Sequence, residues 1–325
     1  MSAMLAMLRR AGWAAALLLA VLVLNFVLMH LAPGDVADTI AGSMGGADAE
    51  TMARIRADYG LDRPLWAQLV DYVGGVLRGD LGHSFFFNRP VTELVLERLP
   101  ATLLLVVTAQ LLALAVGVLL GVISARRPNG LWSHLVTLLA LFGYSAPVFW
   151  TGIMLLIAFS LLVPIFPVAG MQDVTLTGNA FERALDVAHH MVLPVITLAS
   201  IFLALYSRLC RASMMETLGA DFIRTARAKG LGESQVVVKH ALKSSLGPVV
   251  TLAGLQFSAV VSGAVLVEAV FSWPGLGSLA LQSIVARDTP TILGILFFSA
   301  LVVIVGNLAT DLVLRAIDPR IRDGR

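Results

Sequence analysis

Residues 215–248 read METLGADFIRTARAKGLGESQVVVKHALKSSLGP, and this polar stretch separates two strongly apolar segments in the second half of the chain. It contains all three lysines of the protein. Asp221 stands near the start of a helical run, and Arg227 and Lys229 stand near its end. These charges complement the dipole of a helix, and Gly230 is a typical residue to end one. The pattern therefore predicts a short helix that stops at Gly230.

A second short helix is predicted directly after the glycines, over residues 233–246. Two short helices joined at a glycine form a compact element, for which there are two interpretations. An amphipathic loop of this kind can rest on lipid headgroups, or it can dock on another protein. The small side chains of Ala226 and Ala228 favour docking, because they let the helix fit closely into a partner's groove. One side of the second helix is expected to hold Val236, Val237, His240, Ala241 and Ser244.

The composition is that of a membrane protein. Of the 325 residues, 58% are hydrophobic and 14% are charged, whereas a soluble domain carries about 25% charged residues. A net charge of +2 argues against a nucleic-acid partner, and the single Cys210 excludes a disulfide framework and a multi-cysteine metal site. Since a membrane span needs roughly 20 apolar residues, we predict six spans. They are expected at about residues 11–32, 101–124, 133–163, 190–210, 248–270 and 291–315.

These spans divide the chain into a flank with the first span (1–32), an extracytoplasmic segment with short helices (33–100) and a five-helix core (101–325) with an inner loop at 211–247. Basic residues set the orientation, because cytoplasmic loops are enriched in lysine and arginine. With the N-terminus inside, 15 of the 23 basic residues fall on the inner side. Both termini and the inner loop are therefore predicted to be cytoplasmic. The apolar run after Arg9-Arg10 exceeds the core of a cleaved signal peptide, so we expect a retained first helix rather than that alternative.

The polar stretch resembles the cytoplasmic coupling loop of ABC importer permeases, in the form found in the dipeptide, oligopeptide and nickel permease family. Two runs carry the peptide-family pattern: Arg224 to Leu231 reads RTARAKGL, and His240 to Lys243 reads HALK. Both depart from the general importer pattern of Glu-Ala-Ala, then glycine three residues later, and a later Ile-x-Leu-Pro. The resemblance extends over nearly the whole chain, through residues 32–35, 60–65, 78–82, 268–277 and 318–322.

The resemblance implies an all-α integral membrane protein of the bacterial cell membrane, with six transmembrane helices in the type I ABC importer fold and both termini cytoplasmic. It implies a permease subunit of an ATP-driven importer of dipeptides or oligopeptides, with nickel or glutathione as alternative cargo. The expected partners are a sister permease, two ATPase subunits, an extracytoplasmic peptide-binding protein and membrane lipid. ATP and magnesium would be used by the ATPase subunits, and this chain would bind no cofactor. The residues expected to couple to an ATPase are Asp221, Arg224, Thr225, Ala226, Arg227, Ala228, Lys229, Gly230 and His240.

The same resemblance implies that the helix at 220–230 is rigidly continuous with the fourth and fifth spans and transmits ATPase movement to a cavity that alternates between the two sides. The chain shows no site of its own for ATP. A phosphate-binding loop needs Gly-x-x-x-x-Gly-Lys followed by serine or threonine, and the only lysine so followed is Lys243, which comes after Leu242. His189-His190 is not expected to bind a metal, because adjacent side chains on a helix diverge and no third ligand is suitably spaced. No catalytic residue is predicted.

Polar residues and a proline in the spans suggest a translocation path. Pro147 interrupts the third span and frees a backbone carbonyl, which a membrane tolerates in a packed kink or beside a water-filled cavity. Glu268 lies near the outer end of the fifth span, as either a functional acid or a hydrated one. Gln110 is instead expected to form a hydrogen bond between helices. The candidates for the path are Tyr144, Ser145, Gln256, Ser262 and Glu268.

Two other classes of protein compete with an ABC permease. An ion-coupled secondary transporter also has broken helices, but it needs buried ionisable relays near the middle of the membrane, which are sparse here. An intramembrane hydrolase needs a nucleophile beside a base, whereas Ser145 and His190 are separated by a span and a loop. Uptake driven by an ion gradient without ATP would favour the first class, and activity of the isolated chain on peptides would favour the second.

Overall fold

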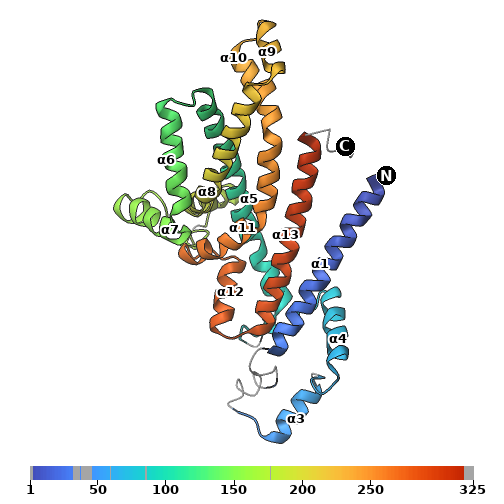
Figure 1. Ribbon diagram of the computed structural model, residues 1–325. Coiled ribbons are helices and arrows are strands. Elements are labelled where there is room, and N and C mark those ends of the chain that lie inside the picture. The colour runs from blue at the N-terminus through green and yellow to red at the C-terminus, as the bar shows by residue number, and fades with distance from the viewer. Residues whose placement is uncertain are drawn as a thin grey trace. The chain divides into compact units, whose positions relative to one another are not determined.

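The computed structural model describes residues 3–31, 37, 46–58, 60–84, 86–175 and 177–317 (Figure 1). The chain forms two compact units, residues 1–100 with 279–304 and residues 101–278 with 305–325. Helices dominate the described residues, so the expected all-α class is confirmed. A short hairpin accompanies them, in which β1 (His83–Ser84) pairs antiparallel with β2 (Arg89–Pro90). The segments 32–35 and 318–322, which contributed to the family resemblance, lie outside the described residues.

The first unit is built on the long apolar helix α1 (Ala3–Leu31), which packs against α4 (Leu65–Leu77). Asn25 of α1 donates from Nδ2 to the carbonyl of Leu293, 3.1 Å away, in α13 (Thr289–Ile317). The ring centroids of Phe26 and Tyr72 are 6.3 Å apart. The unit also contains α3 (Ala49–Asp58), the beginning of α5 (Val91–Arg126) and most of α12 (Leu276–Val285).

The hairpin of the first unit is held by a buried carboxylate. Asp288, only 4% exposed, accepts hydrogen bonds from Ser84 Oγ at 2.5 Å and from Thr291 Oγ1 at 2.6 Å. Because all three side chains are buried, these bonds fasten β1 to the start of α13. The chain turns after α4, where Gly79 and Gly82 have φ of +85° and +87°, a region that glycine adopts without strain.

The second unit is a helical bundle around α8 (Ala180–Leu218), which packs against α6 (Leu131–Ser145), α7 (Val148–Leu156) and α11 (Lys243–Val270). A glycine lets α5 approach α8 at one point: a Cβ at Gly121 would lie 2.6 Å from the Cβ of Cys210. Such small-residue contacts let helix backbones approach one another in a membrane. The remaining elements are η1 (Ile157–Leu162), α9 (Asp221–Ala228), α10 (Glu233–Gln235) and η2 (Val236–Leu242).

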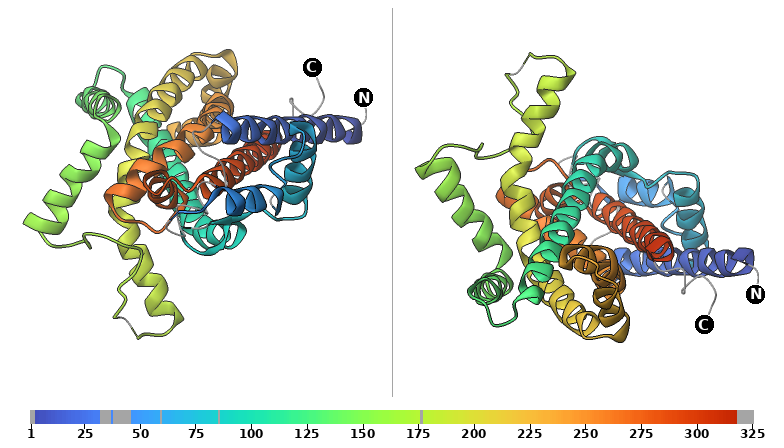
Figure 2. Two further views of the ribbon diagram at one scale, coloured as in Figure 1. Left: turned by 90° about the horizontal axis from the view of Figure 1, so that it is seen from below. Right: turned by 90° about the horizontal axis from the view of Figure 1, so that it is seen from above.

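Five helices within the described residues are long and apolar enough to cross a membrane: Gly12–Leu31, Val91–Arg126, Ala180–Leu218, Glu233–Val270 and Thr289–Leu314. The third span, predicted at 133–163, is broken at Pro147, so the predicted interruption is confirmed. α6 ends at Ser145 and α7 begins at Val148, because the ring of Pro147 cannot continue a helix. Figure 2 shows α6 end on and α7 lengthwise, so the two helices run in different directions. The count of six spans is therefore not confirmed.

Two helices begin about ten residues before the spans that were predicted for them. α5 starts at Val91 and contains Pro100, because a single proline near the start of a long helix removes only one of its hydrogen bonds. α8 starts at Ala180 because a capping box precedes it: Asn179 Oδ1 accepts from the amide of Glu182, and Glu182 Oε2 accepts from the amide of Asn179, both at 3.0 Å. The helix α12 was not predicted at all, since its short apolar run follows a glycine-rich segment.

Candidate coupling surface and translocation path

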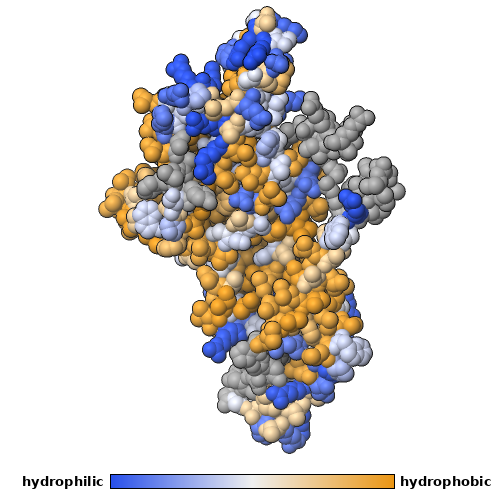
Figure 3. Space-filling view, viewed as in Figure 1, coloured by the Kyte–Doolittle hydropathy of each residue, from blue (hydrophilic) through white to orange (hydrophobic). Residues whose placement is uncertain are grey.

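The helix predicted in the polar stretch is present as α9, and it ends as expected. Its last residue is Ala228, and Gly230 follows with φ of +77°. A side chain with a Cβ is strained in this conformation, so glycine suits the position. The amide of Gly230 donates to the carbonyl of Arg227 at 2.9 Å and completes the turn. Hydrophilic atoms gather over α9 and α10, whereas hydrophobic atoms cover α7 (Figure 3).

One side of α9 is buried and the other is charged. Ile223 is fully buried and Ala226 is 6% exposed, and α9 is in contact with η2. Ala226 therefore serves packing within the chain, which corrects the expectation that its small side chain sits in a partner's groove. Ala228 is exposed, as docking requires. The other exposed residues of the predicted coupling set are Asp221, Arg224, Thr225, Arg227, Lys229 and Gly230.

A two-pronged ion pair closes the turn after α9. Arg227 donates from Nη2 to Oε1 of Glu233 at 2.7 Å and from Nε to Oε2 at 3.1 Å. The two side chains are 42% and 53% exposed, so solvent screens the pair and it adds little to stability. Its paired geometry is specific, however, and it holds the turn at Lys229–Gly232 in one shape. Hydrogen bonding to Glu233 also raises the pKa of Arg227.

The second helix of the polar stretch is not a separate short helix. α10, η2 and α11 follow one another without a break from Glu233 to Val270, and Pro248 lies inside α11. η2 is a π-helix, whose wider turn delays the repeat of the buried side. Ser245 is consequently buried, whereas Ser244, expected on the inner side, is exposed. The other expected residues are buried (Val236, Val237 and Ala241) or partly buried (His240).

The connection between α9 and its neighbours depends on packing rather than on a continuous backbone. The expectation that α9 is rigidly continuous with two spans is wrong, because Gly219–Ala220 and Lys229–Gly232 interrupt the helix on either side. η2, against which α9 packs, does run directly into α11. Ser245 Oγ of α11 lies 3.1 Å from Thr217 Oγ1, so a hydrogen bond ties this region to the end of α8.

All five path candidates lie on α6 and α11. Ser145 is exposed at the end of α6, where the third predicted span breaks. Ser262 is exposed on α11 and donates to the carbonyl of Ser258 at 3.0 Å, and Gln256 is partly buried. The side chain of Tyr144 lies outside the described residues.

Gln110 joins three helices, which confirms its predicted role. Its Nε2 donates to Tyr206 Oη of α8 at 3.0 Å and to the carbonyl of Ala253 of α11 at 3.2 Å. All of these groups belong to the core of the second unit, because Gln110 is only 9% exposed and Tyr206 is fully buried. Movement of α8 or α11 past α5 would therefore have to break these bonds.

Glu268, the fifth path candidate, is fully buried, so its interpretation as a hydrated acid is wrong. Oε1 accepts from Thr102 Oγ1 at 2.6 Å. Oε2 accepts from the amides of Gly277 and Ser278 at 2.7 Å and 3.1 Å. These amides begin α12, where a carboxylate complements the helix dipole. A Cβ at Gly275 would collide with this carboxylate, which explains the glycine there.

Two further residues complete this network, and the sequence analysis missed both as functional residues. Thr102 Oγ1 also accepts from the amide of Leu276 at 2.7 Å, and Trp273 Nε1 donates to the carbonyl of Ala101 at 2.9 Å. Thr102 and Glu268 are 166 positions apart, so no local pattern relates them. The sequence signal for this network is the pair of glycines after Trp273, because glycines are typical of places where the backbone lies close to another group.

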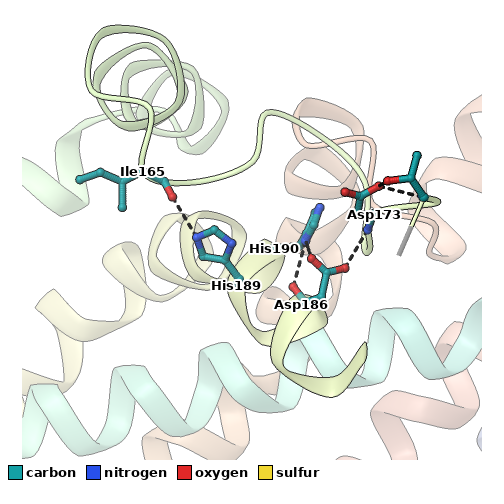
Figure 4. Close-up of polar contacts among 6 residues, drawn as sticks. Ile165, Asp173, Asp186, His189 and His190 are labelled. Carbon is teal, nitrogen blue, oxygen red and sulfur yellow. Dashed lines mark hydrogen bonds and ion pairs between the residues drawn. The ribbon is translucent and has the colours of Figure 1, made fainter. Parts of the chain in front are cut away.

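The histidine pair before the fourth span orders a loop (Figure 4). His189 Nε2 lies 2.9 Å from the carbonyl of Ile165. His190 Nδ1 lies 2.9 Å from the carbonyl of Asp186 and 3.2 Å from its Oδ1, and Asp186 Oδ2 accepts from the amide of Asp173 at 2.7 Å. The two imidazoles thus point to different partners, and within the described ranges no three metal-ligating side chains come together.

Comparison with known proteins covers the whole chain. Residues 117–323 match the family model of the binding-protein-dependent transport system inner membrane component, and residues 4–106 match the model of its N-terminal part. The dipeptide transport system permease protein of Escherichia coli K12 is 40% identical over 332 residues, which cover 97% of this chain and 98% of that protein. The oligopeptide transport system permease protein of Bacillus subtilis 168 is 38% identical over 315 residues, or 96% and 98% of the two chains.

A solved structure supports the same fold. An inward-facing structure of the MetNI methionine ABC transporter superposes with a TM-score of 0.55 at 18% identity, over 69% of this chain and 96% of that one. The likeness places the described helices in the fold of an ABC importer's membrane domain. The chain therefore belongs to the family of binding-protein-dependent transport system inner membrane components, and it is a multi-pass protein of the inner membrane.

Proposed function

We propose that this chain is the permease subunit of an ATP-driven importer of dipeptides or oligopeptides. Full-length similarity to two peptide permeases carries the proposal. The helix α9 supports it, because every residue of the run RTARAKG except Ala226 is exposed. ATP and magnesium are used by two partner ATPase subunits, and a sister permease and an extracytoplasmic binding protein complete the importer. Both termini and α9 face the cytoplasm.

In this proposal an ATPase subunit docks on the exposed side of α9. Arg224 and Lys229 offer positive charge, Asp221 offers negative charge, and Ala228 leaves room for a partner's backbone. His240 lies beside this surface on η2. Pressure on α9 passes through Ile223 to η2, with which α9 packs, because that side chain is fully buried. η2 then moves α11 directly, since the two are continuous.

The same movement reaches the rest of the bundle through hydrogen bonds. Ser245 ties α11 to α8 at Thr217, and Gln110 ties both helices to α5. A packed bundle of this kind has discrete arrangements rather than a continuum, so α11 changes the side to which the path opens. Gln256 and Ser262 on α11, with Ser145 at the break after α6, line that path. Glu268 supports the path by holding the end of α11 in place.

The docking step is tested with the assembled importer in proteoliposomes that contain its ATPase subunits and binding protein. Arg224→Glu combined with Lys229→Glu reverses two exposed charges on α9. We expect peptide uptake and peptide-stimulated ATP hydrolysis to fall at least about tenfold, which corresponds to 1.4 kcal/mol of lost interaction. Arg183→Glu is the matched control, because it reverses an exposed charge in the first turn of α8, away from α9.

A second variant tests transmission separately from docking. Ala226→Leu forces a larger side chain into the buried contact between α9 and η2, so ATP hydrolysis should continue while uptake is lost. Uptake that survives both this change and the double charge reversal would contradict the coupling mechanism. Uptake that follows an ion gradient without ATP would instead favour a secondary transporter. Competition of dipeptides, oligopeptides, glutathione and nickel for uptake identifies the cargo.

A further inference from the structure

A cavity of about 320 Å³ lies among α5, α6 and α8, and the proposed transport mechanism does not use it. Its position is set by the ends of three helices: α5 stops at Arg126, α6 starts at Leu131, and α8 continues past both. The wall combines apolar residues with hydrogen-bond donors. Its residues include Ser124 of α5, Val136 of α6, and Ser207, Arg208, Arg211 and Met215 of α8.

The first sign of a ligand is a buried hydroxyl that has no partner. Ser124 is 1% exposed, and its Oγ makes no hydrogen bond to any residue that the structure describes. A buried polar group left in this state costs about 1–3 kcal/mol, so such groups are rare unless something polar reaches them. Ser124 is also one of the residues that line the cavity.

The second sign is the charge of the wall. Arg208 and Arg211 both line the cavity, and Arg211 is oriented by a bond from its Nη2 to the carbonyl of Pro128 at 3.1 Å. No carboxylate occurs among the described residues of the lining. Guanidinium groups match the geometry of phosphate oxygens and bind them through charge-assisted hydrogen bonds. The donor set therefore favours a phosphate group over a neutral or cationic ligand.

The third sign is the level of the cavity along the helices. The apolar part of α5 ends just before Arg126 and Arg127, and the apolar part of α8 ends just before Arg208. A membrane protein carries such a change of polarity at the boundary where lipid headgroups lie. Val136 and Met215 supply an apolar wall beside the donors, as the glycerol and upper acyl chain of a lipid require.

We propose that this cavity binds the phosphate headgroup of an anionic phospholipid, with Ser124, Arg208 and Arg211 as the donors. The proposal depends on the boundary between apolar and polar helix segments, and it holds whichever side of the membrane α9 faces. It is therefore independent of the peptide cargo and of the coupling mechanism. A bound lipid would bridge the ends of α5 and α8.

The test measures lipid retention by the assembled importer, purified in detergent and depleted of lipid. Phosphatidylglycerol or phosphatidylcholine with the same acyl chains is added, and native mass spectrometry counts the bound molecules. Wild type should retain phosphatidylglycerol in preference. Ser124→Ala combined with Arg208→Gln should weaken that retention about tenfold, the effect of losing one charge-assisted bond. Arg126→Gln is the matched control, because it removes an exposed arginine outside the lining.

Each other outcome overturns the proposal. Equal retention of phosphatidylglycerol by the double variant and wild type would show that the cavity is not the site. Equal losses in the double variant and in Arg126→Gln would show only non-specific attraction to positive charge. Displacement of the lipid by excess inorganic phosphate would leave a phosphate site but remove the lipid as its occupant. Ser124→Ala alone is a second variant that should fold normally, because it removes a hydroxyl that makes no hydrogen bond to the described residues.

Discussion

Replacing Thr102 by valine tests whether the buried network around Glu268 holds the second unit together. Valine has nearly the shape of threonine, so the change removes the hydroxyl and little else. That hydroxyl donates to Glu268 Oε1 at 2.6 Å and accepts from the amide of Leu276 at 2.7 Å. The variant therefore removes one hydrogen bond to the buried carboxyl group of Glu268 and the acceptor of the buried Leu276 amide.

The expected cost follows from these two losses. A hydrogen bond to a charged group contributes about 1.5–3 kcal/mol, and an unsatisfied buried amide costs about 1–3 kcal/mol. Thr102→Val should therefore destabilise the chain by about 3–5 kcal/mol. Thr102→Ser is the matched control, because it keeps the hydroxyl and loses one buried methyl group, worth about 1 kcal/mol.

The chain carries a natural reporter for this measurement. Cys210 is its only cysteine and is fully buried, so it reacts with a thiol reagent when the second unit unfolds. The assembled importer is heated in detergent, pulse-alkylated, and the modification of Cys210 is read by mass spectrometry. At roughly 2–4 °C per kcal/mol, the valine variant should unfold at least about 5 °C below the serine variant.

A valine variant as stable as the serine variant would refute the reasoning. A double-mutant cycle with Glu268→Gln gives a second measurement of the same contact. Residues in one buried network show interaction energies of about 0.5–3 kcal/mol. A value near zero would mean that Thr102 and Glu268 do not stabilise each other, even if each variant were unstable alone.

Three other replacements test close contacts and turns, each by the same alkylation assay. Gly121→Ala puts a Cβ 2.6 Å from the cysteine side chain of α8 and should lower the stability by about 1–3 kcal/mol. The control Gly247→Ala meets nothing within 4 Å and should raise the stability by up to about 1 kcal/mol through helix propensity. Equal unfolding midpoints of the two variants would contradict the close approach of α5 to α8. Gly230→Ala should cost about 1–2 kcal/mol because its φ is +77°, and Gly232→Ala, at φ of −63°, should be nearly neutral; the reverse order would exclude backbone strain as the cause. Gln110→Leu takes the donor from a buried tyrosine hydroxyl and a carbonyl and should cost about 1–3 kcal/mol; wild-type stability would remove its role as a link between helices.

Features that depend on neighbours in the chain could be predicted well. The start of α9 at Asp221 and its end before Gly230 follow from charges and a glycine that lie within one short segment. The apolar spans are similarly local, because about 20 consecutive residues decide whether a helix can cross a membrane. Even Gln110 could be predicted, since a polar side chain inside an apolar helix needs a partner on another helix.

Errors occurred where distant contacts compete with local preference. Pro100 and Pro147 look alike in the sequence, yet α5 continues through the first and α6 ends before the second. Ser244 was predicted on the buried side of the helix at 233–246, and this was wrong because the π-helix η2 shifts the repeat of buried residues. The seven residues of η2 have an ordinary composition, which does not indicate a π-helix. Ala226 was predicted to fit into a partner's groove, because the sequence does not show that this side chain is buried within the chain itself.

The sequence by itself determined that this protein lies in a membrane and that a polar stretch with a short helix ending before Gly230 separates two of its apolar segments. Only the tertiary structure decided that Glu268 is a buried anchor, that α9 is held by packing rather than by a continuous helix, and that Ser124 faces a cavity. The physical reason is one of range. Hydropathy and helix ends arise from residues close together in the chain. Apolar helices of similar composition can pack in many ways, so the residues that they bring into contact depend on the tertiary arrangement.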